Sequence, residues 1–212
     1  MRARFTSAAD GDLGVDAPDV STHRRAVVDA PWSWRRQVHG ADVAVVTAPG
    51  EHAGSTGDAA VTDLAGPVLS AQGADCAPVL FWSPEGVVGA AHAGWRGLVV
   101  GVVQHTVAEM RALGATHVRA LLGPCIHPED YEFGEDDLAQ VVDALGPGVA
   151  ATTRHGTTAL DVPAAVRAAV SAAGARLDHD VDANTADARW FSHRTRGDRG
   201  RHAGVIWSEA PR

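Results

Sequence analysis

Two residues able to bind a metal ion or act as a nucleophilic pair, Cys76 and His92, flank a predicted β-hairpin. Cys76 precedes an apolar run over residues 77–82, and His92 follows a second run over residues 87–91. A Ser-Pro-Glu-Gly segment between the runs is typical of a turn, so the pattern predicts two paired strands. The far ends of a hairpin meet, which places the thiol beside the imidazole. This pairing suits either a metal site or a Cys/His nucleophilic pair.

His39 is the third candidate, because it follows a predicted strand over residues 34–38 and precedes Gly40. A His, Cys, His set leaves one position open on a tetrahedral zinc ion, which is the pattern of catalytic zinc sites. Such an ion would acidify a bound water or polarise a phosphate or carbonyl group. However, most of the 11 histidines lie in predicted loops, and an isolated cysteine is more often a small buried apolar residue. Spacing alone therefore indicates a metal site only weakly.

Further candidates lie close to these three residues in the sequence. Arg96 belongs to Gly-Trp-Arg-Gly at the start of a predicted helix over residues 98–113. Free backbone N–H groups and a guanidinium group there predict an anion site. Asp75 and Gln37 suit either a contact with the reacting groups or a structural hydrogen bond. Cys125 and His127 form a rival metal pair, although the proline residues around them explain that rigid loop without a metal.

Composition excludes several classes of protein. The chain has 212 residues and a formal net charge of −8, and all 18 of its basic residues are arginine. The charge disfavours a general nucleic-acid surface. The absence of lysine excludes Schiff-base chemistry, pyridoxal enzymes and phosphate-loop nucleotide hydrolases. We found no apolar signal segment or membrane span and only two cysteines, so we expect a reduced cytoplasmic protein without membrane attachment.

The order of the predicted elements favours a single α+β domain over residues 1–212, with mixed strands and no internal repeat. We found no linker that would divide it. The main predicted strands cover residues 34–38, 43–47, 58–62, 67–71, 77–82, 87–91, 117–122, 177–183 and 203–207. The main predicted helices cover residues 98–113, 135–145 and 163–173.

Five short motifs occur in an order that is specific to one known family. They are Gln37-Val-His-Gly40, Gly73-Ala-Asp-Cys-Ala-Pro-Val-Leu80, Ala91-His-Ala-Gly-Trp-Arg-Gly97, Leu122-Gly-Pro-Cys-Ile126 with Tyr131-Glu-Phe-Gly134, and Phe191-Ser-His-Arg194 followed by Gly200-Arg201. From about residue 34 to the C-terminus the chain resembles the YfiH family, once called multicopper polyphenol oxidoreductases or laccases and now associated with purine nucleosides.

The resemblance implies a four-layer α/β/β/α fold with mixed sheets, similar to the catalytic domain of the cytotoxic necrotising factor deamidases. It implies one zinc ion on His39, Cys76 and His92, with copper as the alternative metal. The implied activities are phosphorolysis of adenosine, inosine, guanosine and methylthioadenosine, and hydrolytic deamination of adenosine. The expected ligands are thus a purine nucleoside and phosphate, with no nucleic acid and no partner protein, in a monomer.

The same resemblance suggests roles for the surrounding residues. Asp75 and Arg96 join the three zinc ligands as candidate catalytic residues. Arg96, Arg194, Arg201 and Gln37 are the candidate contacts for substrate or phosphate, since guanidinium groups bind phosphate in pairs of hydrogen bonds. The neighbouring Arg196 and Arg199 are predicted to be solvated loop residues.

Two departures from the family pattern affect these expectations. The segment Phe5-Thr-Ser-Ala lacks an arginine that the family carries there, and Asn184 stands where the family has cysteine. The first departure removes a candidate contact to substrate or phosphate. The second removes any role for a third thiol.

Three other functions stay open. Cys76 as thiolate and His92 as base would make an amide hydrolase, for example one that edits peptidoglycan precursors. Copper-dependent oxidation of polyphenols fits the older family name, but a single three-ligand centre cannot supply the several copper ions of a laccase. The last open function is a binding module that catalyses no reaction. The zinc deaminases with His-x-Glu and Pro-Cys-x-x-Cys motifs are excluded, because Pro124-Cys-Ile-His supplies only half of the second motif.

Overall fold

The predicted hairpin forms the centre of the larger sheet in the computed structural model, which describes residues 1–209. Its strands β7 (Ala77–Trp82) and β8 (Val88–Ala93) pair antiparallel, from Ala77 opposite Ala93 to Trp82 opposite Val88. Nearly every residue of the two strands is buried, as expected for strands covered on both faces. The turn between them is closed by a hydrogen bond of 3.0 Å from the amide of Ser83 to the carbonyl of Val87.

The larger sheet has six strands in the order β12-β9-β7-β8-β5-β3. The outer pairs, β12 with β9 and β3 with β5, are parallel, and the inner pairs are antiparallel. The strands not yet given are β3 (Val43–Val45), β5 (Ala59–Thr62), β9 (Arg119–Leu122) and β12 (Arg176–Asp180).

A second sheet of five strands, in the order β1-β13-β6-β2-β4, stacks on the first. Apolar side chains of both sheets meet between them, among them Leu69, Leu80, Val88 and Ile206. Its strands are β1 (Arg2–Phe5), β2 (Trp32–Arg36), β4 (Ser55–Thr56), β6 (Val68–Gly73) and β13 (His202–Trp207).

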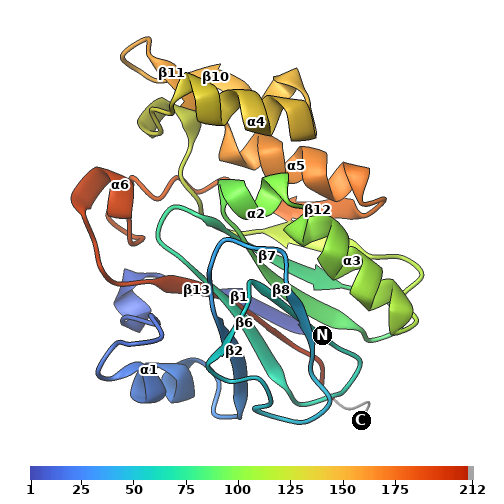
Figure 1. The fold of residues 1–212 in the computed structure, drawn as a ribbon. Coiled ribbons are helices and arrows are strands. Elements are labelled where there is room, and N and C mark those ends of the chain that lie inside the picture. The colour runs from blue at the N-terminus through green and yellow to red at the C-terminus, as the bar shows by residue number, and fades with distance from the viewer. Residues whose placement is uncertain (210–212) are drawn as a thin grey trace.

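Helices cover the outer faces of the two sheets (Figure 1). On the six-stranded sheet they enclose the largest apolar core, which includes Phe81, Val107 and Met110. A smaller cluster around Trp32 and Val205 covers the outer face of the five-stranded sheet beside α1. The helices are α1 (Val20–Val27), α2 (Trp95–Val99), α3 (Val102–Ala112), α4 (Glu135–Leu145), α5 (Val162–Ala172) and α6 (His193–Arg196).

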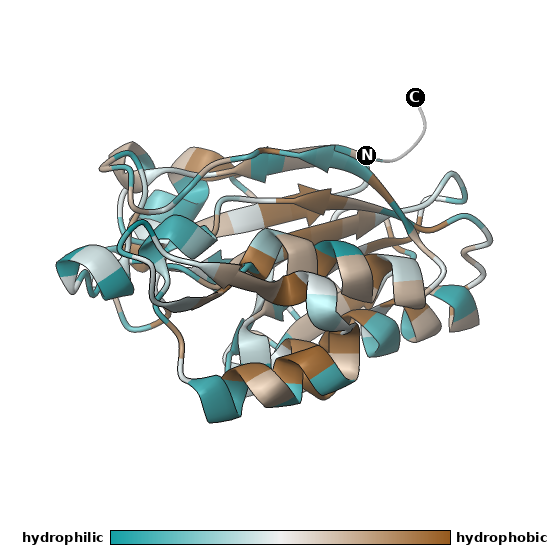
Figure 2. Cartoon of the chain, turned by 90° about the horizontal axis from the view of Figure 1, so that it is seen from above, coloured by the Kyte–Doolittle hydropathy of each residue, from teal (hydrophilic) through white to brown (hydrophobic). Residues whose placement is uncertain are grey.

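The layer order is therefore α/β/β/α, and the predicted fold class is confirmed. Figure 2 shows mostly apolar strands at the centre of the molecule, whereas the helices in front of them carry both apolar and hydrophilic residues. A short hairpin of β10 (Ala150–Thr152) and β11 (Thr158–Leu160) and three 3-10 turns at Ala8–Asp10, Pro128–Asp130 and Pro147–Val149 complete the described elements.

Most predicted elements are shifted at their ends by one to three residues, and two differ in ways that matter for the site. The helix predicted over residues 98–113 is divided into α2 and α3, because Gly101 adopts a left-handed conformation with φ of 87° between them. The strand predicted over residues 177–183 ends at Asp180, and the chain then turns through Asp182, whose φ is also positive. Within residues 1–209, none of the helices combines the length and apolar character needed to span a bilayer. The predicted domain of residues 1–212 includes residues 210–212, which lie outside the described part.

Candidate functional site

The structure brings His39, Cys76 and His92 together at one end of the central hairpin. One ligand atom from each residue lies within 4.8 Å of the other two. The Sγ atom of Cys76 is 3.8 Å from Nε2 of His39, and the rings of His39 and His92 lie edge to face with centroids 4.8 Å apart. Among the described residues, this is the only group of three such side chains close enough to share an ion.

The donor set and its surroundings fit zinc. His92 is buried, and its Nδ1 lies 2.9 Å from the carboxylate of Asp58, so the opposite ring nitrogen, Nε2, is left for a metal. A carboxylate on the second nitrogen is the usual partner of a zinc-binding histidine. Gly94 lets the chain pass close by, since a Cβ atom there would lie 2.6 Å from the ring of His39 and 3.1 Å from Sγ of Cys76. Three ligands with a free fourth position match a catalytic zinc site.

Electrostatics favour the thiolate form of Cys76. Burial opposes its ionisation, but the charge of His92 and a hydrogen bond from His39 outweigh burial and lower its pKa to about 6. Burial likewise opposes the charged form of His92, yet the Cys76 thiolate and Asp58 raise its pKa to about 9. Despite burial, the hydrogen bonds from His92 and nearby backbone amides lower the pKa of Asp58. The two groups thus favour each other's charged forms when no metal is bound.

A cavity of about 330 Å³ opens over this centre. This volume lies at the lower end of the range for small-molecule sites. The lining of the cavity includes seven of the eight site residues predicted from the sequence, all except Arg96. The lining residues are Gln37, His39, Gln72, Gly73, Ala74, Asp75, Cys76, His92, Tyr131, His193, Arg194 and Arg201.

Arg96 and Gln37 do not present free polar groups to this cavity. The guanidinium group of Arg96 is exposed and stacks on the ring of Trp95, at 4.1 Å from its centroid. Both amide atoms of Gln37 bond to the backbone of Gln72, at 2.9 Å for Nε2 to the carbonyl and 2.8 Å for Oε1 to the amide. The side chain of Gln37 thus continues the pairing of β2 with β6 beyond the last bonded strand residues.

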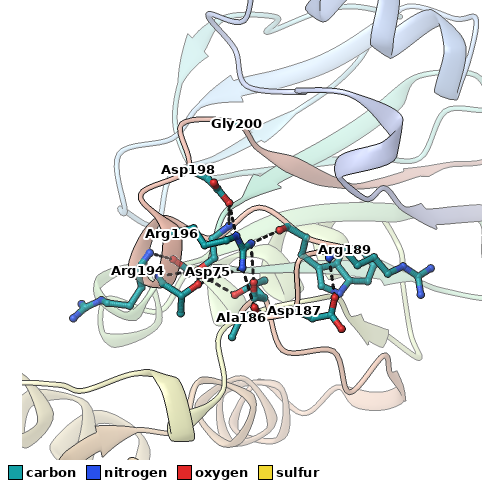
Figure 3. Close-up of polar contacts among 12 residues, drawn as sticks. Asp75, Ala186, Asp187, Arg189, Arg194, Arg196, Asp198 and Gly200 are labelled. Carbon is teal, nitrogen blue, oxygen red and sulfur yellow. Dashed lines mark hydrogen bonds and ion pairs between the residues drawn. The ribbon is translucent and has the colours of Figure 1, made fainter.

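Asp75 anchors a second wall of the cavity, formed by the segment of residues 184–201, and Figure 3 shows its contacts with that segment. Its carboxylate accepts hydrogen bonds from the hydroxyls of Thr185 at 2.7 Å and Ser192 at 2.6 Å, and from the amide of Arg194 at 2.7 Å. Asp75 is buried and adopts a φ of 102°, which is rare for a residue with a side chain. These contacts give Asp75 a structural role in holding Arg194 over the cavity.

Arg196 is the second anchor of this wall: it is exposed to solvent, as predicted, but its guanidinium group also makes several hydrogen bonds. Its guanidinium group donates to the carbonyl of Ala186 at 2.8 Å, to the carbonyls of Thr185 and Trp190, and to the carboxylate of Asp198 at 3.1 Å. Figure 3 shows it at the centre of these contacts. A segment with almost no regular structure is thereby held by side chains.

The two arginines predicted to bind phosphate line the cavity from this wall. The guanidinium group of Arg194 lies over the ring of Tyr131, at 4.9 Å from its centroid, and donates to the carbonyl of Glu132 at 3.2 Å. One guanidinium nitrogen of Arg201, NH1, donates to the carbonyls of Arg199 and Gly200, each at 2.8 Å. Their remaining N–H groups stay available to an anion.

Asn184 has a structural place where the family carries cysteine. Its Nδ2 donates to Glu129 at 3.1 Å and to Asp130 at 2.8 Å, and its Oδ1 accepts from the amide of His127 at 3.3 Å. Cys125, one residue of the rival metal pair, is buried, and burial raises its pKa well above the ordinary value. This loop therefore needs no metal to hold its shape.

Sequence reasoning missed Asp58 and the wall role of Tyr131. Tyr131 was noted only as part of a motif, although an aromatic residue next to a predicted rigid loop is a usable signal. Asp58 directly precedes a short apolar strand, β5, and an acidic residue at such a position has many ordinary explanations. The role of Asp58 is recognised only in the folded structure, because the pairing of β5 with β8 brings Asp58 beside His92.

The chain matches the family model described as multi-copper polyphenol oxidoreductase laccase over residues 9–209. A protein of Streptomyces coelicolor named purine nucleoside phosphorylase is 44% identical over 208 residues, which cover 93% of this chain and 86% of that protein. The crystal structure of YlmD from Geobacillus stearothermophilus is 31% identical with a TM-score of 0.81, covering 93% of this chain and 84% of that one.

A third comparison concerns the fold alone. The crystal structure of the Bacillus licheniformis protein YfiH superposes with a TM-score of 0.85 over 98% of this chain and 92% of that one, at 24% identity. The matched model spans nearly all of the described residues, and the order of the sequence motifs agrees with it. This chain therefore belongs to the YfiH family, the family of the multi-copper polyphenol oxidoreductase laccase model.

Proposed function

We propose that the chain is a zinc-dependent purine nucleoside phosphorylase that acts on adenosine, inosine, guanosine and methylthioadenosine, and that it also deaminates adenosine. The observation that carries this proposal is the shared cavity, whose lining contains both the His39, Cys76 and His92 cluster and the two arginines Arg194 and Arg201. A relative named purine nucleoside phosphorylase, 44% identical over most of both chains, supports the same reaction.

His39, Cys76 and His92 would hold the zinc ion. When bound, zinc supplies Lewis-acid catalysis, which serves both a nucleoside oxygen and the hydrolytic reaction at C6 of adenine. The buried position of His92 and its bond to Asp58 keep this ligand fixed before substrate arrives. Gly94 leaves the approach to Cys76 and His39 free of side-chain atoms.

Arg194 and Arg201 would bind phosphate. Phosphorolysis forms a bond between a phosphate oxygen and C1′ of the ribose and breaks the bond from C1′ to N9 of the purine. An anion beside the ribose therefore needs cationic groups on that side of the cavity, and arginine pairs well with phosphate. The carboxylate of Asp75 accepts a hydrogen bond of 2.7 Å from the backbone amide of Arg194, which fixes the backbone position from which the guanidinium group extends.

Tyr131 would pack against the purine ring. Its ring lines the cavity and packs on Phe133 with centroids 5.2 Å apart, and Phe133 in turn contacts Trp95 edge to face. The guanidinium group of Arg194 lies over the ring of Tyr131, 4.9 Å from its centroid, so the two planar groups together would offer a purine a surface to pack against. We assign no phosphate contact to Arg96, because its guanidinium group lies outside the cavity lining, and only a positioning role to Gln37.

A second candidate function is amide hydrolysis by Cys76 with a histidine base, for example on a peptidoglycan precursor. The observation in its favour is the thiol itself, which lies 3.8 Å from His39 and has a pKa of about 6 in the metal-free centre. A thiolate at neutral pH is the form that attacks a carbonyl group. Copper-dependent phenol oxidation gains no such support, since the described residues contain one three-ligand cluster where a laccase needs several copper ions.

Chromatography of adenosine incubations tests the proposal. The purified protein is incubated with and without phosphate, and with and without a zinc chelator. We expect adenine only with phosphate, inosine in both phosphate conditions, and neither product after chelation until zinc is restored. A folded, zinc-loaded protein that forms neither product would overturn the proposal. Turnover of an amide substrate that persists in chelator, together with alkylation of Cys76, would establish the second candidate instead.

A further inference from the structure

Asp58 makes an unusual number of contacts for one carboxylate at the edge of the metal cluster. Its side chain is wholly buried and lies immediately before β5. Besides Nδ1 of His92 at 2.9 Å, it accepts hydrogen bonds from three successive backbone amides, those of Val38 at 3.2 Å, His39 at 2.9 Å and Gly40 at 2.8 Å. Its two oxygens thus connect two segments that are distant in the sequence.

The contact with His92 fixes one ligand. Because the carboxylate can only accept, Nδ1 of His92 must carry the proton, and Nε2 is then free to donate its lone pair. The backbone reinforces this arrangement, since the amide of His92 donates to the carbonyl of Asp58 at 2.8 Å. Asp58 therefore holds both the ring and the backbone of His92.

The contacts with residues 38–40 fix a second ligand. His39 has an exposed side chain and a left-handed backbone with φ of 61°, which is uncommon for a residue other than glycine. His39 lies outside the strands and its ring is exposed, so neither strand pairing nor burial keeps its backbone in this left-handed conformation. The three amide bonds to Asp58 do so, in the manner of backbone N–H groups that wrap an anion.

We propose that Asp58 is the positioning residue of the metal centre, and that one buried carboxylate sets the ring of His92 and the backbone of His39 for zinc binding. This inference rests on the zinc-binding part of the proposed function. It accounts for two of the three ligands, whereas Cys76 is placed by β7 itself.

The first test measures the affinity of Asp58→Asn for Zn²⁺ by competition with a chromogenic chelator. The amide has the shape of the carboxylate, but its NH₂ group would face N–H donors. We expect zinc affinity to fall by about 10- to 100-fold, as for other lost partners of metal-binding histidines. The matched control is Asp178→Asn, which breaks a carboxylate contact with Arg119 on the distant strand β12 and should bind zinc like the wild type. An affinity within twofold of wild type for Asp58→Asn would overturn the inference.

The second test needs no variant and therefore does not depend on the folding of Asp58→Asn. Nitrogen NMR of the zinc-loaded wild type, with labelled histidine, reports which nitrogen of His92 carries a proton. We expect a protonated Nδ1 and a metal-bound Nε2, and metal on Nδ1 would overturn the inference. A wild type that binds no zinc would overturn the proposed zinc dependence as well, so the two failures are distinguishable.

Discussion

The two walls of the cavity are built by different means. In the wall that carries the metal-binding candidates, Cys76 directly precedes β7 and His92 lies in β8, and the residues of these strands are almost all buried between a second sheet and the helices. The wall that carries Arg194 and Arg201 is an irregular segment, residues 184–201, held by hydrogen bonds from Asp75 and Arg196. Packing and strand register position Cys76 and His92, whereas a few polar side chains hold the second wall, as Asp58 holds the backbone of His39. Under the proposed function, catalysis and the binding of phosphate would therefore depend on different kinds of contact.

Removing the thiol gives the largest expected effect and breaks the strand-built wall only. Cys76→Ala should lose zinc binding and reduce phosphorolysis by at least about a thousandfold, because a ligand is lost outright and lost neighbours of ligands already cost 10- to 100-fold. Bound zinc and adenine formation are measured together. The control Cys125→Ala, at a buried cysteine outside the cavity, should keep zinc. An active, zinc-free Cys76→Ala protein would contradict the expected role.

Asp75→Asn should loosen the irregular wall and leave the metal centre intact. Asparagine tolerates the positive φ, but it cannot accept all three hydrogen bonds of the carboxylate. We expect the free energy of unfolding to fall by about 2–4 kcal/mol, since buried hydroxyls lose their partner. Denaturant unfolding and zinc content measure the two effects.

The exposed Asp187 is a matched control for this change, because its carboxylate accepts one amide bond from Arg189 in a surface turn. Asp187→Asn should change stability by less than about 0.5 kcal/mol. The comparison of the two walls would fail if Asp75→Asn lost zinc with the same ease as Cys76→Ala.

His202 makes the junction of the irregular wall with β13 sensitive to acid. It is fully buried against Trp190, and burial lowers its pKa to about 4, with Asp75 acting in the opposite direction. The unfolded chain takes up a proton near pH 6.5, before the folded protein does, so stability is lost as the pH falls from about 6.5 to 4. This residue accounts for at most about 3 kcal/mol of that loss.

The measurement is chemical unfolding as a function of pH for the wild type and His202→Phe. We expect the variant to lose less stability than the wild type across this interval. Equal pH dependence of the two proteins would show that another group controls the acid response.

Arg194→Met gives the smallest expected effect and separates the binding wall from the metal wall. The KM for phosphate should rise about tenfold, which corresponds to about 1.4 kcal/mol, with little change in zinc content. Arg96→Met is the matched control, since its guanidinium group stacks on Trp95 outside the cavity. A larger rise in the KM for phosphate in Arg96→Met would reverse the assignment.

The two walls also differ in how far the sequence predicts them. The central hairpin follows from two apolar runs and a turn, and the structure confirms it together with the meeting of Cys76 and His92. Arg96 is expected to face an anion because it lies at the start of a predicted helix; it does lie in the first turn of α2, but its guanidinium group stacks on Trp95 outside the cavity lining.

The remaining parts have no periodic signal. Residues 184–201 owe their path to contacts such as that of Arg196 with the carbonyl of Ala186, which involve neither alternation nor helical spacing. Asp58 meets its partners only after β5 has paired with β8, so no local pattern distinguishes it from an ordinary acidic residue before a strand. The family resemblance names the candidate ligands, but it does not name Asp58, which contacts two of them.

The β7–β8 hairpin also has a consequence for how the centre assembles. Cys76 and His92 are sixteen residues apart and meet as soon as one local hairpin forms, an event of microseconds in isolated hairpins. His39 must close a longer loop, because it lies 37 residues before Cys76. A folding chain therefore has a two-ligand half-site before it has the full site. Because a register slip of one residue would turn His92 to the opposite face, an ion captured at that stage would select the correct strand pairing.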